Sequence, residues 1–96
     1  FHPMKLQQQT TRLTVVGGGS WATALVKILS ENNVSIKWWM RRRTDAEHIK
    51  RFHHNKSYLS DVQINPRKVK ICTRLRDAFR ESEYVILAVP AAFVAD

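Results

Sequence analysis

The chain has 96 residues, of which 44% are apolar and 25% are charged, and this is typical of one small globular domain. Lysine and arginine number 16 against eight acidic residues, which leaves a formal net charge of +8. The single cysteine, Cys72, excludes an intramolecular disulfide, and we expect it to be a small buried residue in a reducing, cytoplasmic compartment. No secretory signal is apparent, and the longest apolar run, Tyr84 to Ala95, is too short to cross a membrane.

The first two predicted elements flank the only glycines of the chain. Residues 1–11 are polar, and because Met4 resembles a natural start we expect a tag and leader there, before a domain over residues 12–96. The β-branched run Leu13–Val16 predicts a buried strand that ends at the glycines. From Ser20 to Asn32 the spacing is helical, and the predicted inward face consists of Trp21, Leu25, Ile28 and Leu29.

A strand, a helix and a loop are predicted in the middle of the chain. Val34–Met40 is rich in β-branched and aromatic residues and predicts a second strand. Thr44 is expected to cap the next helix, with Glu47 completing a capping box. Residues 55–67 are predicted to be a loop. The side chains expected to face inward from the helix are Ile49 and Phe52.

The last part of the chain completes the alternation of strands and helices. Val69–Cys72 predicts a third strand, and residues 73–82 a short helix. Tyr84–Val89 predicts a fourth strand, so apolar that it is expected to be covered on both faces. This order predicts an α/β fold, a Rossmann-like doubly wound parallel sheet truncated after about four strands. The residues that the short helix is expected to bury are Leu75, Ala78 and Phe79.

All three glycines of the chain are adjacent, between the first strand and the first helix. The run from Gly17 to Ala22 fits G-x-G-x-x-A, the fingerprint of a dinucleotide-binding turn in this strand–helix context. Gly17 is expected to form the tight turn, Gly19 to let a pyrophosphate approach, and Ala22 to keep the helix near the sheet. A glycine-rich turn without a ligand is the alternative. The neighbouring positions stay open: Ser20 is a helix cap, a phosphate contact or both, and Trp21 is core or cofactor contact.

The end of the second strand bears on which dinucleotide is preferred. An enzyme specific for NAD usually carries an acidic residue there to hold the ribose hydroxyls. Here Arg41, Arg42 and Arg43 follow the strand, and no acidic residue appears before Asp45. Guanidinium groups suit a 2′-phosphate, so NADP is favoured over NAD, or both are used. The alternative is that these arginines are a solvated loop.

Three separated blocks make the sequence resemble the N-terminal domain of NAD(P)-dependent glycerol-3-phosphate dehydrogenases of the bacterial type. Together they cover Arg12 to Asp96 in the order of that family. The blocks are Val15–Leu25 with its glycine-serine-tryptophan pattern, His53–Leu59, similar to H-x-N-x-x-Y-L, and Ile86–Phe93, similar to the turn beside the nicotinamide ribose.

The resemblance implies cofactor-binding roles within these blocks. Besides the glycines, the implied residues are Ser20, Trp21, Arg41, Arg42, Tyr58, Pro90 and Phe93, although Tyr58 could equally be a packing residue. Two positions depart from the pattern. Ser60-Asp61 stands where Pro-Gly usually follows Tyr-Leu, and Ala22 replaces a commoner glycine.

The family interconverts glycerol 3-phosphate and dihydroxyacetone phosphate by hydride transfer. Its catalytic lysines lie beyond the fourth strand and in a helical C-terminal domain, so the resemblance implies no catalytic residue in this chain. We expect a cofactor-binding fragment that is inactive alone and that meets a small phosphorylated substrate only within an intact enzyme. A β-hydroxyacid or ketopantoate-type reductase and a free-standing nucleotide sensor are the alternatives.

Two other functions and one association remain as hypotheses. The basic run over residues 41–56 could hold nucleic acid, but no nucleic-acid module is visible, and a solvated helix face is preferred. The histidines His48, His53 and His54 lack the spacing of metal ligands. The fourth strand is expected at a sheet edge, where strand pairing would produce a homo-oligomer.

Overall fold

The computed structural model describes residues 10–56 and 59–89. The greater part of the predicted leader and three of the predicted cofactor residues, Tyr58, Pro90 and Phe93, lie outside the described residues.

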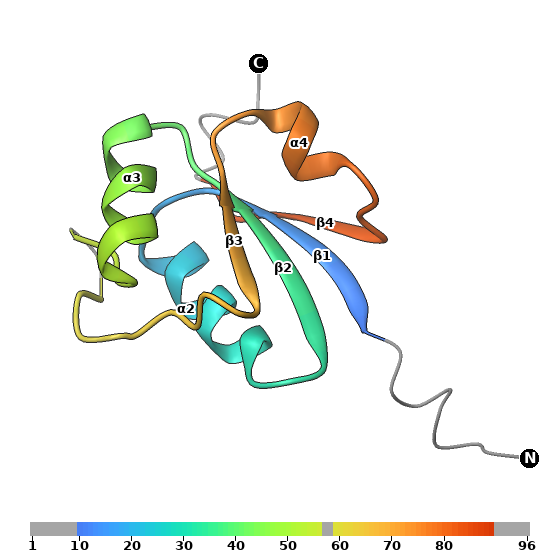
Figure 1. The fold of residues 1–96 in the computed structure, drawn as a ribbon, viewed down its shortest axis with the longest axis horizontal. Coiled ribbons are helices and arrows are strands. Elements are labelled where there is room, and N and C mark those ends of the chain that lie inside the picture. The colour runs from blue at the N-terminus through green and yellow to red at the C-terminus, as the bar shows by residue number, and fades with distance from the viewer. Residues whose placement is uncertain (1–9, 57–58, 90–96) are drawn as a thin grey trace, which may run out of the picture.

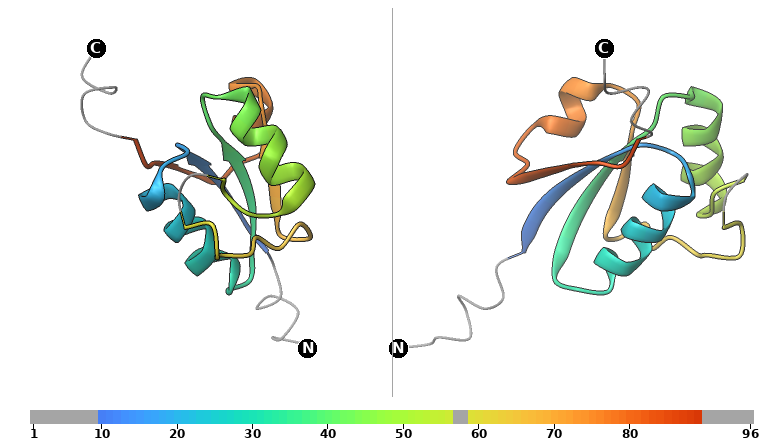
Figure 2. Two further views of the ribbon diagram at one scale, coloured as in Figure 1. Left: turned by 90° about the vertical axis from the view of Figure 1, so that its left-hand side faces the viewer. Right: turned by 180° about the vertical axis from the view of Figure 1, so that it is seen from behind.

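Strands and helices alternate along the described chain, as the sequence predicts. The elements are β1 (Thr11–Val16), α2 (Ser20–Ser30), β2 (Val34–Trp39), α3 (Arg43–Phe52), β3 (Val69–Cys72), α4 (Leu75–Phe79) and β4 (Tyr84–Leu87). The strands form one parallel sheet in the order β3-β2-β1-β4. The strands separate α4 from α2 and α3, so helices cover both faces (Figures 1 and 2). This arrangement confirms the Rossmann-like fold and places β4 at an edge.

The core lies between the sheet and the pair α2 and α3. Two rows of buried side chains cross the strands β1, β2 and β3 in register, one row through Ile36 and one through Trp38. Alternation along each strand brings every member of these rows to the same face. The rows are Leu13–Ile36–Val69 and Val15–Trp38–Ile71, and the helices cover them with Ala22, Val26, Ala46 and Ile49.

The short helix α4 is attached to the opposite face largely by polar contacts. The Thr14 hydroxyl bonds to the Ala78 carbonyl and to the Ser82 hydroxyl. The Lys37 ammonium donates to the Arg80 carbonyl at 2.6 Å and to that of Asp77 at 3.3 Å. Ala78 is the buried residue of the helix, whereas the predicted core residues Leu75 and Phe79 are more than two-fifths exposed. Hydrogen bonds to helix carbonyls therefore position α4 where its apolar contact area is small.

The inward face of α2 differs from the predicted one. Trp21 is 65% exposed and Ile28 is 59% exposed, while Ala22, Thr23 and Val26 are completely buried. Leu25 and Leu29 contact the core from the flanks. The helix lies close to the sheet, and that approach selects small side chains for the contact face and moves the bulky ones outward. The spacing of the apolar residues alone predicts that the face of α2 carrying Trp21 and Ile28 packs on the sheet, and this prediction is wrong.

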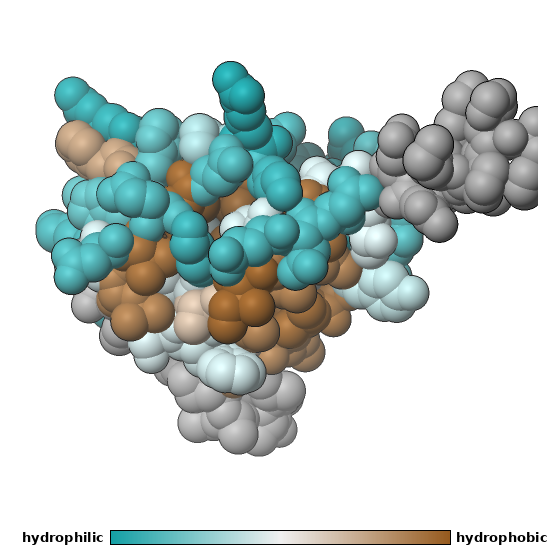
Figure 3. All heavy atoms as spheres, turned by 90° about the horizontal axis from the view of Figure 1, so that it is seen from below, coloured by the Kyte–Doolittle hydropathy of each residue, from teal (hydrophilic) through white to brown (hydrophobic). Residues whose placement is uncertain are grey.

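Three further sequence predictions are wrong in detail. The helix α3 begins at Arg43, and its cap residue Arg42 makes no side-chain capping bond, so Thr44 does not form the capping box. Phe52, predicted to face inward, is half-exposed. Tyr84 is 62% and Leu87 58% exposed, so β4 is not covered on both faces by the described residues. On the face of the molecule shown in Figure 3, hydrophobic side chains gather on the surface beside a band of hydrophilic ones.

Because Cys72 is buried, the stability of the folded chain is expected to depend on pH in the alkaline range. Cys72 is a free, buried cysteine at the end of β3, as predicted, and burial raises its pKa although Lys70 and Lys37 act in the opposite direction. A raised pKa means that the folded chain holds this proton more tightly than the unfolded chain. The resulting stability is complete below the ordinary thiol pKa of about 8.5 and is lost as the pH rises through the raised value.

We therefore expect the free energy of unfolding to fall more steeply above about pH 8.5 in the parent chain than in Cys72→Ala. Urea denaturation of both proteins across that range measures the difference. Parallel pH profiles for the two proteins would contradict the assignment.

Candidate functional site

The turn after β1 requires glycine at its first position. Gly17 has φ of 136°, a conformation that residues with a side chain rarely adopt. Its amide donates to the Trp39 carbonyl at 2.8 Å, which ties the turn to the end of β2. A Cβ atom at Gly17 would overlap the carbonyl oxygen of Ala88 and lie 2.9 Å from its carbon. Backbone angle and close packing thus both require the missing side chain.

The other two glycines differ from Gly17 in what surrounds them. A Cβ atom at Gly18 would lie 3.0 Å from the Cβ of Met40, the residue after β2. A Cβ atom at Gly19 would meet nothing within 4 Å. Gly19 is also the cap residue of α2, with φ of −85°, which any residue can adopt. Neither crowding nor the backbone angle in the described chain therefore requires glycine at position 19, whereas close approach of a ligand would.

Buried side chains hold the carbonyl groups of all three glycines. Trp38 Nε1 donates to the Gly17 carbonyl at 2.5 Å, and Asn55 Nδ2 donates to that of Gly18 at 3.1 Å. The Thr23 hydroxyl donates to the Gly19 carbonyl at 2.8 Å, from the first turn of α2.

Orientation of these carbonyls determines the direction of the amides. No peptide bond in the described chain is cis, so each N–H points opposite to the carbonyl of the same peptide. The N–H groups of Gly18, Gly19 and Ser20 are therefore directed away from the buried donors. They lie at the N-terminus of α2, where the helix dipole adds positive potential. Such a row of amides is suited to a phosphate or another anion.

The structure decides between some of the roles predicted for the residues that follow the glycines. Ser20 is the first helical residue and is exposed, and its side chain does not cap α2. Trp21 lies on the surface, so core packing is wrong for this residue. Ala22 is completely buried, in agreement with its predicted role of bringing helix and sheet together.

The arginines and the glycine turn both follow the carboxyl ends of strands, at the same end of the sheet. β1 and β2 are parallel, so the segments that follow them leave the sheet side by side. Met40 packs against Gly18, and the exposed residues Arg41 and Arg42 come directly after it. The first acidic residue beyond them, Asp45, lies in the first turn of α3. Positive charge thus gathers beside the turn.

Three residues that hold the turn are not identified as site residues by the sequence pattern. Asn55 belongs to the block His53–Leu59, whose resemblance to a family motif does not by itself give this position a role. It is 2% exposed although it follows a helix in a polar segment. Trp38 shows in the sequence only the pattern of a strand residue. Thr23 offered a local signal, because a threonine four residues after Gly19 can bond back to its carbonyl.

Other groups of side chains show no comparable arrangement. The ring of His48 contacts those of Phe52 and His54, with centroids 4.7 and 4.8 Å apart. Within residues 10–56 and 59–89, no three histidine, cysteine, aspartate or glutamate side chains are grouped to hold a metal ion. No helix of that part of the chain is long and apolar enough to span a membrane.

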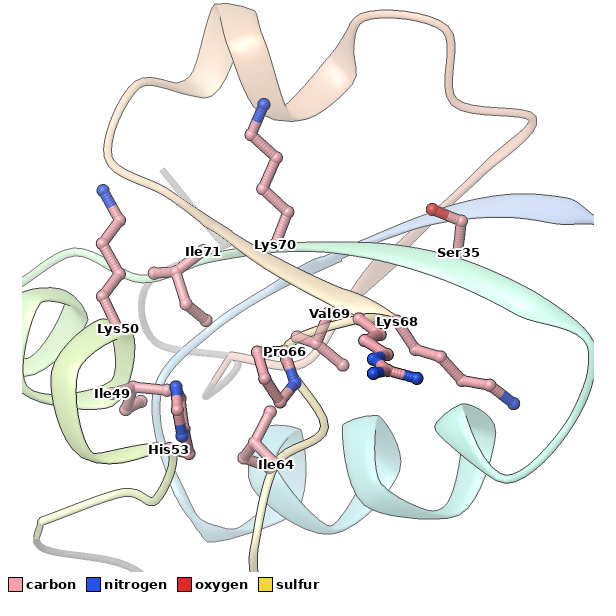
Figure 4. A pocket seen from close by; sticks show the side chains of 11 residues that line it. Ser35, Ile49, Lys50, His53, Ile64, Pro66, Lys68, Val69, Lys70 and Ile71 are labelled. Atoms are coloured by element: carbon pink, nitrogen blue, oxygen red, sulfur yellow. The ribbon is translucent and has the colours of Figure 1, made fainter.

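A shallow groove runs along β3, the strand at the opposite edge of the sheet from β4. Its lining is mainly apolar, with lysines at the rim, and contains none of the glycine-turn residues (Figure 4). The labelled side chains of Ile49, His53 and Ile64 come from α3 and the segments that follow it. The groove is therefore separate from the turn.

Comparison with known proteins yields one family model, described as NAD-dependent glycerol-3-phosphate dehydrogenase N-terminus, which matches residues 12–96. A glycerol-3-phosphate dehydrogenase (NAD(P)+) of Leuconostoc mesenteroides is 34% identical over 86 residues, covering 90% of this chain and 25% of the relative. That of a Thermoanaerobacter species is 39% identical over 85 residues, covering 88% and 25%. The chain thus spans about a quarter of the length of these curated relatives.

A solved structure shows the same fold. The chain superposes on a crystal structure of glycerol-3-phosphate dehydrogenase from Coxiella burnetii with a TM-score of 0.75. The match covers 81% of this chain and 24% of the other, at 19% sequence identity.

Proposed function

The chain belongs to the family of NAD-dependent glycerol-3-phosphate dehydrogenase N-termini, and we propose that it binds the dinucleotide of such an enzyme at its Gly17–Gly19 turn. One observation carries this proposal: the carbonyls of all three glycines are held by buried donors, which directs three successive amides away from the core. The pyrophosphate would accept hydrogen bonds from these amides, and the open space at Gly19 would admit it.

We propose that the chain is the cofactor-binding part of a longer enzyme. This enzyme would carry out the dehydrogenation of glycerol 3-phosphate that the names of its relatives print, and the reverse reduction of dihydroxyacetone phosphate. In the oxidative direction a hydride would pass from C2 of glycerol 3-phosphate to the nicotinamide, and the hydroxyl proton would leave to a base. The present chain would supply the cofactor site, and the catalytic base and the phosphate site of the substrate would come from the remainder. Cytoplasmic location is part of the proposal, since the buried thiol of Cys72 is free.

We propose further that Arg41 and Arg42 favour NADPH over NADH. Both lie beside the turn at the end of β2, where a ribose 2′-phosphate would meet guanidinium groups. The double variant Arg41→Glu with Arg42→Glu is expected to weaken NADPH binding about tenfold to a hundredfold, because carboxylates would replace two cations beside a doubly charged phosphate. Binding of NADH, which lacks that phosphate, is expected to change several-fold less.

Fluorescence titrations with both cofactors at one ionic strength measure the preference. The double variant Arg74→Glu with Arg76→Glu is the matched control, since it makes the same change in net charge at exposed positions of α4 and its cap. Equal losses for NADPH and NADH, or equal losses in the control, would sink the 2′-phosphate assignment.

The outer edge of β4 is proposed to pair with a second copy of the chain. Within the described residues β4 pairs only with β1, and Tyr84, Val85 and Leu87 are exposed along it. An apolar strand with a free edge is a template for strand pairing. Light scattering is expected to show a concentration-dependent dimer that Val85→Lys weakens. A parent chain that stays monomeric at high concentration would refute this pairing.

A further inference from the structure

One side chain outside the glycine turn contacts both the turn and the helix that follows it. Asn55 stands beyond the end of α3 and is 37 residues from Gly18 along the chain. Its Nδ2 atom lies 3.1 Å from the Gly18 carbonyl oxygen and 3.0 Å from the Thr23 hydroxyl oxygen. The residue is 2% exposed, so water does not compete for these bonds.

The chemistry of the partners determines how these groups are oriented. The Gly18 carbonyl can only accept, so it must face the amide nitrogen of Asn55 and not the amide oxygen. The second hydrogen of that nitrogen points to the Thr23 hydroxyl, which accepts it and donates its own hydrogen to the Gly19 carbonyl at 2.8 Å. A single amide group thus holds the Gly18 carbonyl directly and supports the Gly19 carbonyl through the Thr23 hydroxyl. The Gly19 carbonyl also accepts the Thr23 backbone N–H at 3.0 Å.

We propose that Asn55 is a positioning residue that fixes the Gly18 carbonyl inward, supports that of Gly19 through Thr23, and thereby sets the affinity of the turn for the pyrophosphate. This inference rests on the proposed function. Glycine peptides rotate easily, because no Cβ atom restricts their backbone angles. Without the Asn55 donor, the Gly18–Gly19 peptide would turn its carbonyl outward in part of the molecules, and that carbonyl would repel a phosphate.

The expected effect is a loss of affinity in proportion to the fraction of turns that stay competent. Asn55→Leu removes the donor, keeps a similar shape and adds no charge to the site. We expect it to bind NADPH at least about tenfold more weakly than the parent chain. Binding of 2′-AMP, which carries the adenine and the 2′-phosphate but no pyrophosphate, is expected to stay within about twofold.

Asn32→Leu is the matched control, because it makes the same replacement at an exposed position beyond the other end of α2. Thr23→Val is a second variant in case Asn55→Leu folds poorly. It removes the hydroxyl that joins Asn55 to the Gly19 carbonyl, while the backbone N–H of residue 23 still holds that carbonyl, so we expect a smaller loss of the same kind. NMR relaxation of the Gly18 and Gly19 amides in the ligand-free chain reports turn order directly, and we expect greater mobility there in Asn55→Leu.

The outcomes separate this inference from the proposed function. A parent chain that fails to bind NADPH contradicts the proposed function, and the role of Asn55 is then decided by NMR alone. Unchanged order of the Gly18 and Gly19 amides in a folded Asn55→Leu overturns the positioning role. Parent-like NADPH affinity in that variant, or equal losses for NADPH and 2′-AMP, overturns it as well.

Discussion

The substitution Gly17→Ala is expected to lower the free energy of unfolding by about 4 kcal/mol, a large fraction of the roughly 5–15 kcal/mol that a small domain possesses. Alanine at this position would keep a φ near 136° at a strain cost or move the turn. Its Cβ atom would overlap the backbone of Ala88, just beyond β4, and no rotamer change relieves a backbone clash. Because the Gly17 amide also bonds to Trp39, any shift of the turn would break its contact with β2.

Chemical denaturation followed by circular dichroism measures this loss. Gly19→Ala serves as its control, since both variants add one methyl group to the same turn. A Gly17→Ala protein as stable as Gly19→Ala would show that the turn does not have the backbone described here.

Gly19→Ala is expected to lower affinity for NADPH about a hundredfold while leaving the stability of the chain nearly unchanged. A Cβ atom at this position meets nothing within 4 Å, and the backbone angle of Gly19 is open to alanine. Added bulk therefore costs the folded chain little. The same methyl group would project into the space through which a pyrophosphate must approach the amides of Gly19 and Ser20.

Parallel titration and denaturation of Gly19→Ala separate the two effects. Unaltered affinity would mean that the ligand does not pass over Gly19. A large loss of stability would mean that the space beside Gly19 is filled by the chain itself. Gly17→Ala and Gly19→Ala thus distinguish a glycine required by folding from a glycine required by a ligand.

The order of strands and helices could be predicted from local patterns, because each element carries its own signal. Leu13–Val16 and the three glycines together identify a strand and the turn after it, and a regular alternation leaves few topologies for a parallel sheet. The position of β4 at the edge, beside β1, follows from the same rules. Ala22 at the third fingerprint position indicated how closely α2 would approach the sheet.

Which side chains are buried could be predicted less well from the sequence. For α2 the apolar spacing favoured Trp21 and Ile28, but the short distance to the sheet selected Ala22, Thr23 and Val26. For α4 the apolar pattern could not show that bonds from Lys37 and Thr14 would hold the helix. The role of Asn55 depends on a contact with Gly18 made across 37 residues, which no local pattern encodes.

A titration of the parent chain with NADPH, followed through the backbone amide signals in NMR, tests the central claim most directly. The account predicts saturable binding with the largest shift changes at the amides of Gly18, Gly19 and Ser20. Saturable binding that moves mainly the signals of β3 and its groove would contradict it, and so would the absence of binding.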